Sequence, residues 1–230
     1  MSRGVFVTGT DTGVGKTVVA CALLRALRAR GLRVAPMKPV AAGAVPHGDG
    51  WANEDTIALA RAAGPGAPPP GEITPVLLRE AIAPHVAAAR EGRAIALAPL
   101  VEAHRALARA CDFTVVEGVG GFRVPLARGL DAADLAAALG LPVVLVVGLR
   151  LGCLNHALLT AESVARAGLP LAGWVANAID PAMAARDENV AALAERLGAP
   201  LLGLLPFAPD GETPGPEERL DVATLLARAG

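Results

Sequence analysis

The 230-residue chain is 53% hydrophobic and carries a net charge of −1 at pH 7. This length and hydrophobic content suit one large α/β domain, and the balanced charge gives no electrostatic bias toward nucleic acid or acidic membranes. Aromatic residues make up only 3% of the chain, so few side chains are available to stack on single-stranded nucleic acid.

The cysteines and the most apolar segment indicate where the protein works. The three cysteines, Cys21, Cys111 and Cys153, lack CxxC spacing, which favours reduced thiols over a disulfide or a zinc site. The most apolar stretch, residues 135–149, is interrupted by a glycine and a proline and is shorter than the roughly 20 residues that span a bilayer. No signal segment is evident at the N-terminus. We therefore expect a cytoplasmic protein that does not insert into membranes.

Apolar runs alternate with amphipathic helical patterns along the chain. The runs predict strands at residues 5–8, 33–37, 113–116, 143–147, 171–176 and 201–205. Helical periodicity predicts helices at residues 16–30, 53–63, 131–139, 154–167 and 184–197. Asn53 is placed to cap the second helix at its start, and Gly31 to end the first. Residues 42–50 and 64–71 are rich in glycine and small or proline residues, and we expect loops there.

The strand runs are continuously apolar instead of alternating, as expected for strands covered on both faces. Nothing in the chain is typical of a long linker. The prediction is one domain over residues 1–230, with a doubly wound, mostly parallel sheet and helices on both faces. Such folds bind ligands at the carboxyl ends of their strands.

A glycine-rich loop joins the first strand to the first helix. Residues 9–17 are GTDTGVGKT, in which inward-turned N–H groups and the helix N-terminus can bind phosphate. Lys16 would reach the β- and γ-phosphates, and Thr17 would bind Mg²⁺. Position 10 is threonine where the common pattern G-x-x-x-x-G-K-[ST] has glycine. A ligand-free turn is the alternative, but the junction favours a P-loop NTPase-like fold that binds ATP and Mg²⁺.

Further charged residues lie at strand and helix ends. Glu117 ends the strand at residues 113–116 and resembles the acid that P-loop proteins place beside Mg²⁺. Asp55 lies in the first turn of a helix, where an acid is common without any ligand. Lys38 follows the second strand, so it lies either near the phosphates or on the surface. The role of Arg150 stays open between substrate contact and solvent.

Taken together, these segments resemble dethiobiotin synthetase over most of the chain, from Val5 to about Asp210. The similar segments are GTDTGVGKT at 9–17, KPVA at 38–41, NED at 53–55, APH at 83–85, VEGVGG at 116–121, LGCLNHA at 151–157, GWVAN at 173–177 and LLPF at 204–207. A P-loop alone is shared by many families, whereas this ordered set is specific.

The resemblance implies a reaction of biotin biosynthesis. ATP and CO₂ would convert 7,8-diaminopelargonate to dethiobiotin, ADP and phosphate. The path would run through a carbamate, then a carbamic-phosphoric anhydride, and would end with ring closure by the second amine. It also implies Mg²⁺ as cofactor, ATP as co-substrate and a homodimer with sites at its interface, with no nucleic acid or membrane partner.

The resemblance also assigns residue roles. Thr12, Lys16 and Lys38 would be catalytic, around the phosphates and the carbamate, and Thr17, Asp55 and Glu117 would serve Mg²⁺ directly or through water. Nucleotide contacts would come from Asp11, Gly13, Val14, Gly15, Lys16, Thr17, Val18, Asn177, Pro206 and Asp210, with Asn177 at the adenine edge. Substrate contacts would come from Thr12, Lys38, Ala42, Gly120, Gly152, Cys153, Leu154 and Asn155, the last four in the partner subunit.

One residue departs from the family pattern, since Ala42 stands where the family often has serine. One lost hydrogen bond is worth about 0.5–1.5 kcal/mol, so we expect a modest kinetic effect. Replacing Lys16 or Lys38 by alanine is expected to abolish turnover while the fold survives.

Three other classes of P-loop protein carry features that this chain lacks. Partitioning or septum-placing ATPases usually carry a second lysine early in the loop, where this chain has Asp11. Amidating enzymes of the cobyrinate type need a further glutamine-hydrolysing domain, for which 230 residues leave no room. Nucleotide kinases carry an arginine-rich lid that is not evident before Glu117.

Overall fold

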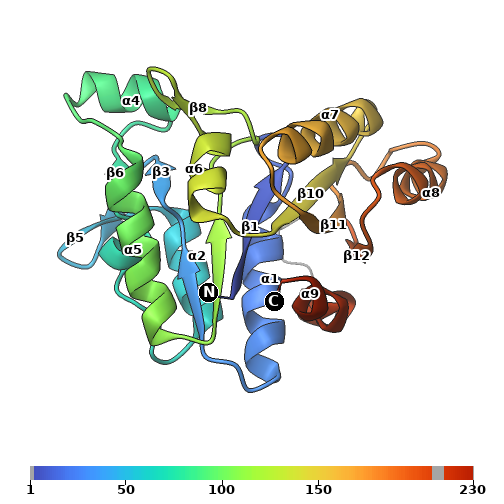
Figure 1. The fold of residues 1–230 in the computed structure, drawn as a ribbon, viewed down its shortest axis with the longest axis horizontal. Helices are drawn as coiled ribbons and strands as arrows, with labels where there is room; N and C mark the ends of the chain where they lie inside the picture. Colours follow the sequence, from blue (N-terminus) through green and yellow to red (C-terminus); the bar gives the residue numbers. More distant parts are fainter. Residues whose placement is uncertain (1–2, 209–214, 230) are drawn as a thin grey trace.

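The computed structural model describes residues 3–208 and 215–229 (Figure 1). Its centre is a six-stranded sheet of order β12-β11-β10-β1-β7-β2 in which every neighbouring pair is parallel. The strands are β1 (Gly4–Gly9), β2 (Val34–Met37), β7 (Phe113–Glu117), β10 (Val143–Leu149), β11 (Leu171–Ala178) and β12 (Leu201–Leu205). The predicted parallel α/β architecture is confirmed.

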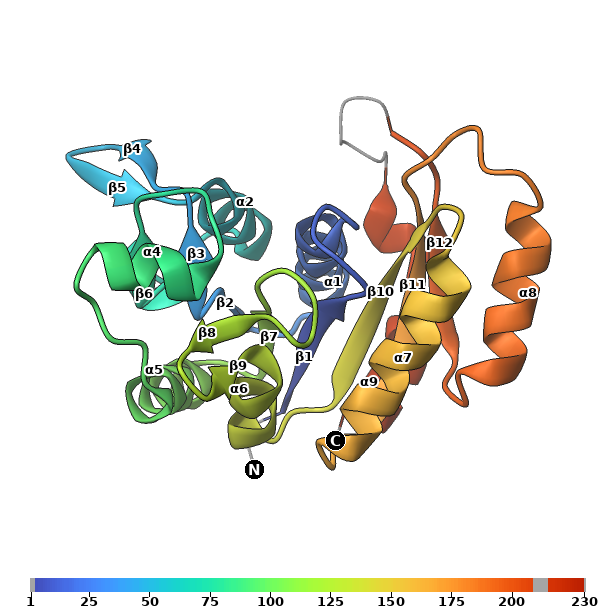
Figure 2. The same cartoon turned by 90° about the horizontal axis from the view of Figure 1, so that it is seen from above.

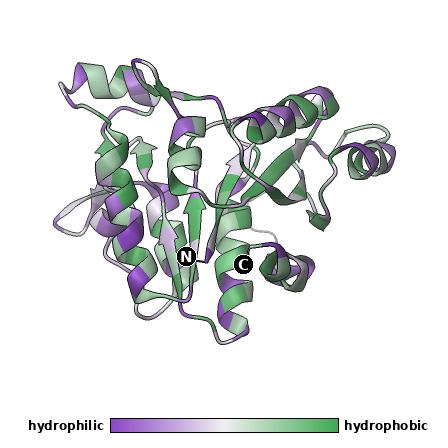
Figure 3. Ribbon diagram, viewed as in Figure 1, coloured by the Kyte–Doolittle hydropathy of each residue, from purple (hydrophilic) through white to green (hydrophobic). Residues whose placement is uncertain are grey.

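Helices cover both faces of this sheet (Figure 2). One face packs α1 (Lys16–Ala29), α2 (Glu54–Ala63) and α9 (Val222–Arg228) around a single apolar cluster. The other face packs α5 (Leu97–Ala110), α6 (Ala132–Leu139), α7 (Cys153–Arg166) and α8 (Arg186–Arg196). Because both faces are covered, β1, β7 and β10 are buried at every residue, which explains their continuous hydrophobicity. Figure 3 shows these strands as hydrophobic and the helices as mixed in polarity.

The predicted helices are present, with small shifts at their ends. Helix α2 begins after Asn53, whose side chain accepts a hydrogen bond from the Asp55 N–H, as expected of an N-cap. Gly31 follows the end of α1 with a φ of 82°, a left-handed conformation that ends a helix at low cost. Helix α8 begins at Arg186 instead of residue 184.

Two predicted loops are corrected. Within residues 42–50, the chain forms β4 (Val45–His47), which pairs antiparallel with β5 (Gly50–Ala52). These three-residue strands are too short and too exposed to show a hydrophobic period. Within residues 64–71, helix α3 (Pro70–Ile73) begins at a proline, which is tolerated in a first helical turn.

The remaining elements were not predicted. They are β3 (Val40–Ala42), β6 (Val76–Leu78), α4 (Pro84–Arg90), α5, β8 (Pro125–Ala127), β9 (Leu130–Asp131), a 3₁₀ turn (Pro216–Arg219) and α9. Most are short and lie outside the central sheet, so tertiary pairing decides their conformation more than local pattern does. Among the described helices, none combines the length and the apolar character that crossing a bilayer demands.

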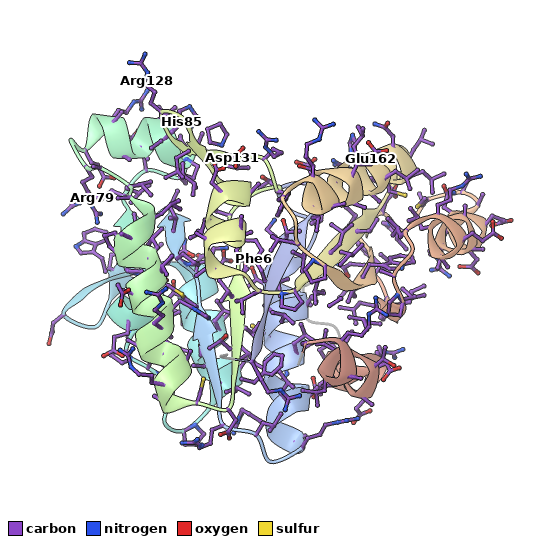
Figure 4. All side chains as sticks on the ribbon, in the orientation of Figure 1. Phe6, Arg79, His85, Arg128, Asp131 and Glu162 are labelled. Carbon is purple, nitrogen blue, oxygen red and sulfur yellow. The ribbon has the colours of Figure 1, made fainter. Side chains whose placement is uncertain are left out.

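Helix α6 is held at its start by a reciprocal capping box. Asp131 accepts hydrogen bonds from the N–H groups of Ala133 and Asp134, and the Asp134 carboxylate accepts one from the Asp131 N–H. Figure 4 shows Asp131 beside the first turn of this helix. Arg123 also pairs with Asp131, from an exposed position.

Replacing Asp131 by alanine is expected to lower the free energy of unfolding by about 1 kcal/mol, because two helix N–H groups lose their acceptor. For a chain of this size the melting temperature should fall by roughly 2–4 °C. Asp131→Ser, which keeps an oxygen acceptor but loses the ion pair to Arg123, should recover most of the loss. Equal melting temperatures for the serine and alanine variants would show that the cap contributes nothing.

Candidate functional site

The glycine-rich loop connects the carboxyl end of β1 to α1 and packs against β11. Asn177, which is buried on β11, donates from Nδ2 to the Val14 carbonyl oxygen at 2.9 Å. A Cβ on Gly15 would lie 2.1 Å from the same Nδ2, and Gly15 has a φ of 90°. Position 15 therefore requires glycine both for its backbone conformation and for this close approach.

Threonine at position 10 is compatible with this loop. The Thr10 N–H donates to the Val146 carbonyl oxygen at 3.0 Å, so the residue continues the hydrogen bonding between β1 and β10. Ala185 is the one non-glycine residue with positive φ among residues 3–208 and 215–229. Position 10 thus needs no glycine in this loop, and the departure from the common pattern carries no backbone strain.

Asp11 joins three parts of the site. Its carboxylate accepts a hydrogen bond from the Thr12 N–H at 2.7 Å and pairs with the guanidinium of Arg150, which follows β10. Its carbonyl oxygen accepts a hydrogen bond from Lys16 Nζ at 2.9 Å. The structure therefore connects Arg150, whose role the sequence left open, to the phosphate loop.

Two acids and a lysine meet beside this loop, at the carboxyl ends of β2 and β7. Lys38 Nζ lies 2.6 Å from Glu117 Oε1 and 2.8 Å from Asp55 Oδ2. The side chains of Lys38 and Glu117 are only 4% and 1% exposed. Thr17 Oγ1 lies 2.9 Å from an oxygen of each acid. Lys38 is thus buried at the site and is not a surface lysine.

Burial and the neighbouring charges shift the pKa values of this cluster in different directions. Burial raises the pKa of Glu117, although Lys38 opposes that shift. Burial alone would lower the pKa of Lys38, but the carboxylates of Glu117 and Asp55 outweigh it and raise that pKa. Burial opposes ionisation of Asp55, yet the adjacent Lys38 and the Thr17 hydroxyl bring its pKa below the usual value. The ammonium group and the Asp55 carboxylate are therefore both charged at neutral pH.

Lys16 behaves differently, because its nearest polar partner is a neutral carbonyl. Burial, followed by the positive charge of Lys38, lowers its pKa to about 8. The whole chain contains only two lysines, and both lie in this site. All other basic side chains that stay charged at neutral pH are arginines.

The arrangement fits a magnesium ion. Oε2 of Glu117 is buried and has no hydrogen-bond partner, and the single Thr17 hydroxyl proton cannot serve both acids at once. A cation near these oxygens would satisfy them. Mg²⁺ is usually bound by one or two carboxylates together with water and phosphate. No cluster of three metal-ligating His, Cys, Asp or Glu side chains occurs in the described residues, which is consistent with that mode.

These residues line a cavity of about 800 Å³. Of the residues assigned from the sequence, the cavity contains Thr12, Gly13, Gly15, Lys16, Thr17, Val18, Lys38, Ala42, Asp55, Glu117 and Gly120. Asp11, Val14 and Asn177 support the loop from outside the cavity wall. Pro206 follows β12, and Asp210 lies outside the described residues.

Four assigned residues lie elsewhere. Gly152, Cys153, Leu154 and Asn155 are at the start of α7 and do not line this cavity. Gly152 has a φ of 96°, so its position at the helix start favours glycine. Their assignment to substrate binding from a partner subunit stays a prediction.

The sequence missed two parts of the wall. Asn53 was assigned only as a helix cap, but it also lines the cavity and donates from Nδ2 to the carbonyl oxygens of Ala42 and Gly43. Residues 81–84 form a further wall with the exposed side chain of Ile82. For Asn53, the signal in the sequence was its spacing from Asp55. A cap residue two positions before Asp55 fixes the start of the helix and therefore the direction of that acid.

Replacing Lys38 by methionine is expected to lower stability at neutral pH by roughly 3–5 kcal/mol, because Glu117 stays buried without its cation. The second change Glu117→Gln in the same chain should restore much of that loss, since it removes the unpaired charge. Chemical denaturation of the two single variants, the double variant and the parent protein measures the effect. Additive losses would contradict a coupled pair.

Comparison with known proteins shows the family to which the chain belongs. A family model described as AAA domain matches residues 3–214. Among solved structures, septum site-determining protein MinD from Pyrococcus horikoshii, complexed with Mg-ADP, is 18% identical with a TM-score of 0.58, covering 100% of this chain and 93% of its own. The ParA family ATPase from Chlorobium tepidum is 14% identical with a TM-score of 0.55, covering 99% of this chain and 97% of its own.

The signal recognition particle receptor FtsY from Elizabethkingia anophelis is 16% identical with a TM-score of 0.53. The match covers 98% of this chain and 66% of FtsY, so this chain spans just under two thirds of that receptor. At these identities the likeness establishes the fold alone. The chain has a P-loop NTPase fold and belongs to the AAA domain family AAA_26, which includes dethiobiotin synthetase.

Proposed function

We propose that this protein is a cytoplasmic dethiobiotin synthetase, which uses ATP and CO₂ to close a ring on 7,8-diaminopelargonate. The observation that carries the proposal is the second lysine. Lys38 is buried and charged, and it lies at the edge of a cavity that also contains the phosphate loop. The lysine of the P-loop binds the phosphates, whereas Lys38 follows the carboxyl end of β2, outside that loop. A second fixed cation suits a reaction in which another anion must approach ATP.

The reaction needs such an arrangement. A carbamate and the γ-phosphate of ATP are both negative, so their approach is opposed unless cations lie between them. Lys16 extends from the loop and Lys38 from the carboxyl end of β2, so the two ammonium groups enter one cavity from different elements. Lys38 is anchored by two carboxylates, which keeps its charge in place and leaves little reorganisation during the reaction.

The other wall of the cavity suits an aliphatic substrate. It contains Ala41, Ile82, Val119, Val124 and Pro125, which have no polar side-chain atoms. Such a surface favours the carbon chain of the diamine, while the charged wall favours ATP. A Cβ on Gly120 would lie 2.6 Å from Val124 and 3.4 Å from the Thr12 hydroxyl, so a larger residue there would narrow the passage between the two walls.

The assigned residues then have distinct tasks. Thr12 and Lys16 bind the phosphates, and Lys38 neutralises the carbamate and orients it toward them. Mg²⁺, held by Thr17, Asp55 and Glu117, would supply further neutralisation of the phosphate charge. The methyl side chain of Ala42 has no group that can hydrogen-bond to the substrate. The start of α7, from Gly152 to Asn155, would bind the substrate carboxylate across a homodimer interface.

A regulatory ATPase is the alternative that the structural likeness to MinD and ParA raises. Where such ATPases usually have a second loop lysine, this chain has Asp11. The Asp11 carboxylate accepts a hydrogen bond from the Thr12 N–H and pairs with Arg150. Asp11 therefore cannot supply the cation that a second loop lysine gives the regulatory ATPases. This favours the synthetase.

Incubating the protein with Mg-ATP, labelled bicarbonate and 7,8-diaminopelargonate should give acid-stable label that depends on the diamine, with equal ADP release. Lys16→Ala and Lys38→Ala should each lower this incorporation by at least about a hundredfold, as removal of a transition-state charge contact does. Lys38→Ala that retains near-normal turnover would remove this lysine from the mechanism. Nucleotide turnover without incorporation would reject the synthetase and leave the ATPase.

Nucleotide binding should take up a proton above neutral pH. With a pKa of about 8, Lys16 is only about one quarter protonated at pH 8.5 in the free protein. Phosphate oxygens beside it raise that pKa, so binding adds the missing charge, and affinity should fall as pH rises above about 8. At pH 7 the lysine is already mostly charged and little uptake is expected.

Calorimetry at pH 8.5 in two buffers of different ionisation enthalpy measures this uptake. Lys16→Arg is the matched control, because arginine stays charged and should bind without uptake. Equal uptake in the parent protein and in Lys16→Arg would assign the proton to another group.

A further inference from the structure

A second cavity, of about 530 Å³, lies beside the amino end of β2, whereas the nucleotide site lies at the carboxyl ends of the strands. It is formed where α1, α2 and α5 end and β2 begins, at the bottom of the view in Figure 1. We call it the lower cavity, and its lining includes Arg28, Leu32, Val34, Pro65, Glu72 and Leu107. Its volume falls within the range of roughly 300–1,000 Å³ that small-molecule sites occupy. None of the proposed chemistry uses it.

The lower cavity combines an apolar surface with two charges of opposite sign. Arg28 donates from Nη1 to the Ala62 carbonyl oxygen at 3.1 Å. Its guanidinium lies against Gly64, where a Cβ would come within 2.3–2.5 Å of three guanidinium atoms. The guanidinium is thus held in one orientation with further N–H groups available. Glu72 lines the same cavity and makes no ion pair with another described residue.

Arg33 also lines this cavity, but its guanidinium is already paired with a carboxylate of the protein. Arg33 donates two hydrogen bonds to the Asp112 carboxylate, at 3.2 and 2.6 Å, and one to the Ala110 carbonyl oxygen. Arg28 and Glu72 therefore remain to bind a ligand's charges. A molecule that fits has an anionic end, a cationic end and an apolar body between them.

Three of the elements that form this cavity, α1, α2 and β2, also reach the nucleotide site. Helix α1 carries Lys16 at its start and Arg28 near its end. Helix α2 carries Asp55 at its start and ends at Ala63, which lines the lower cavity. Strand β2 begins at Val34 in the lower cavity and leads to Lys38 in the site. A ligand that shifts the ends of α1 and α2 or the start of β2 acts on the elements that position the charged cluster.

We propose that the lower cavity is an effector site for amino-terminated alkyl carboxylates. The carboxylate binds Arg28, the ammonium binds Glu72, and the alkyl chain lies on Leu32, Val34 and Leu107. Occupation changes the affinity of the protein for Mg-ATP. This inference needs nucleotide binding only and is independent of the carboxylation reaction.

Cys111 provides a reporter within the lower cavity. It is half-buried, whereas Cys21 and Cys153 are buried, so a thiol reagent should modify Cys111 first. Burial raises the pKa of the Cys111 thiol, and alkylation is therefore measured at pH 8.5, where more thiolate is present. The Cys111→Ser variant, which lacks the reporter, identifies any label on the other two cysteines.

The probe is 8-aminooctanoate, with octanoate and octylamine as controls that each lack one charge. Saturating 8-aminooctanoate should slow alkylation of Cys111 at least fivefold, and each control should bind about tenfold more weakly because one charged contact is lost. Glu72→Gln should weaken 8-aminooctanoate about tenfold and leave octanoate unchanged. Arg28→Met should weaken both 8-aminooctanoate and octanoate, but it also removes the hydrogen bond from α1 to α2. Glu72 is exposed, so Glu72→Gln tests the site without that loss.

The effector role is tested by coupling. Calorimetric Kd values for Mg-ATP, with and without saturating 8-aminooctanoate, should differ by about fivefold or more, and Mg-ATP must change the Kd of 8-aminooctanoate by the same factor. No protection of Cys111 by the probe would overturn the site. Equal protection by octanoate would overturn the ligand class, and protection with an unchanged Kd for Mg-ATP would overturn the effector role.

Discussion

The ion pair between Lys38 and Glu117 is the interaction on which this site depends. Both side chains are almost completely buried, and a buried charge without a partner costs several kcal/mol. Removing Lys38 or Glu117 alone is therefore expected to lower stability. Their positions at the carboxyl ends of adjacent strands β2 and β7 set the distance between them, and Asp55 completes the pairing from α2.

The loop that follows Glu117 at the end of β7 depends on close packing of its backbone against neighbouring side chains. A Cβ on Gly118, directly after Glu117, would lie 3.0 Å from the ring of Phe6. Figure 4 shows Phe6 at the centre of the molecule, on the sheet. On the other side of β1, Val14 of the phosphate loop packs within 3 Å of where a Cβ on Gly148 would lie. The small residues at these strand ends bring the phosphate loop, the acid and the lysine into one cavity.

The two lysines have different electrostatic roles because their partners differ. Lys38 has two carboxylates and stays charged, whereas Lys16 has the Asp11 carbonyl oxygen and a lowered pKa. A fixed cation suits an anion that is held in place. Lys16, with its pKa of about 8, gains charge on phosphate binding only where the pH lies above neutral. The use of arginine at every other permanently basic position leaves primary amines only where the site requires them, apart from the N-terminus.

The amino-acid sequence by itself determined the parallel α/β fold, the phosphate loop and the positions of the main strands along the chain. These depend on local features that a sequence carries: continuous apolar runs, helical periodicity and the glycines of residues 9–17. It also placed Glu117 and Lys38 at strand ends. The tertiary structure decided that Lys38 is buried, that Arg150 pairs with Asp11 and that Asn53 lines the cavity. It also decided the short strands β3 to β6, whose pairing partners lie outside the central sheet. Contacts between residues as far apart as 11 and 150 depend on how strands are ordered in the sheet, and no local pattern encodes that distance.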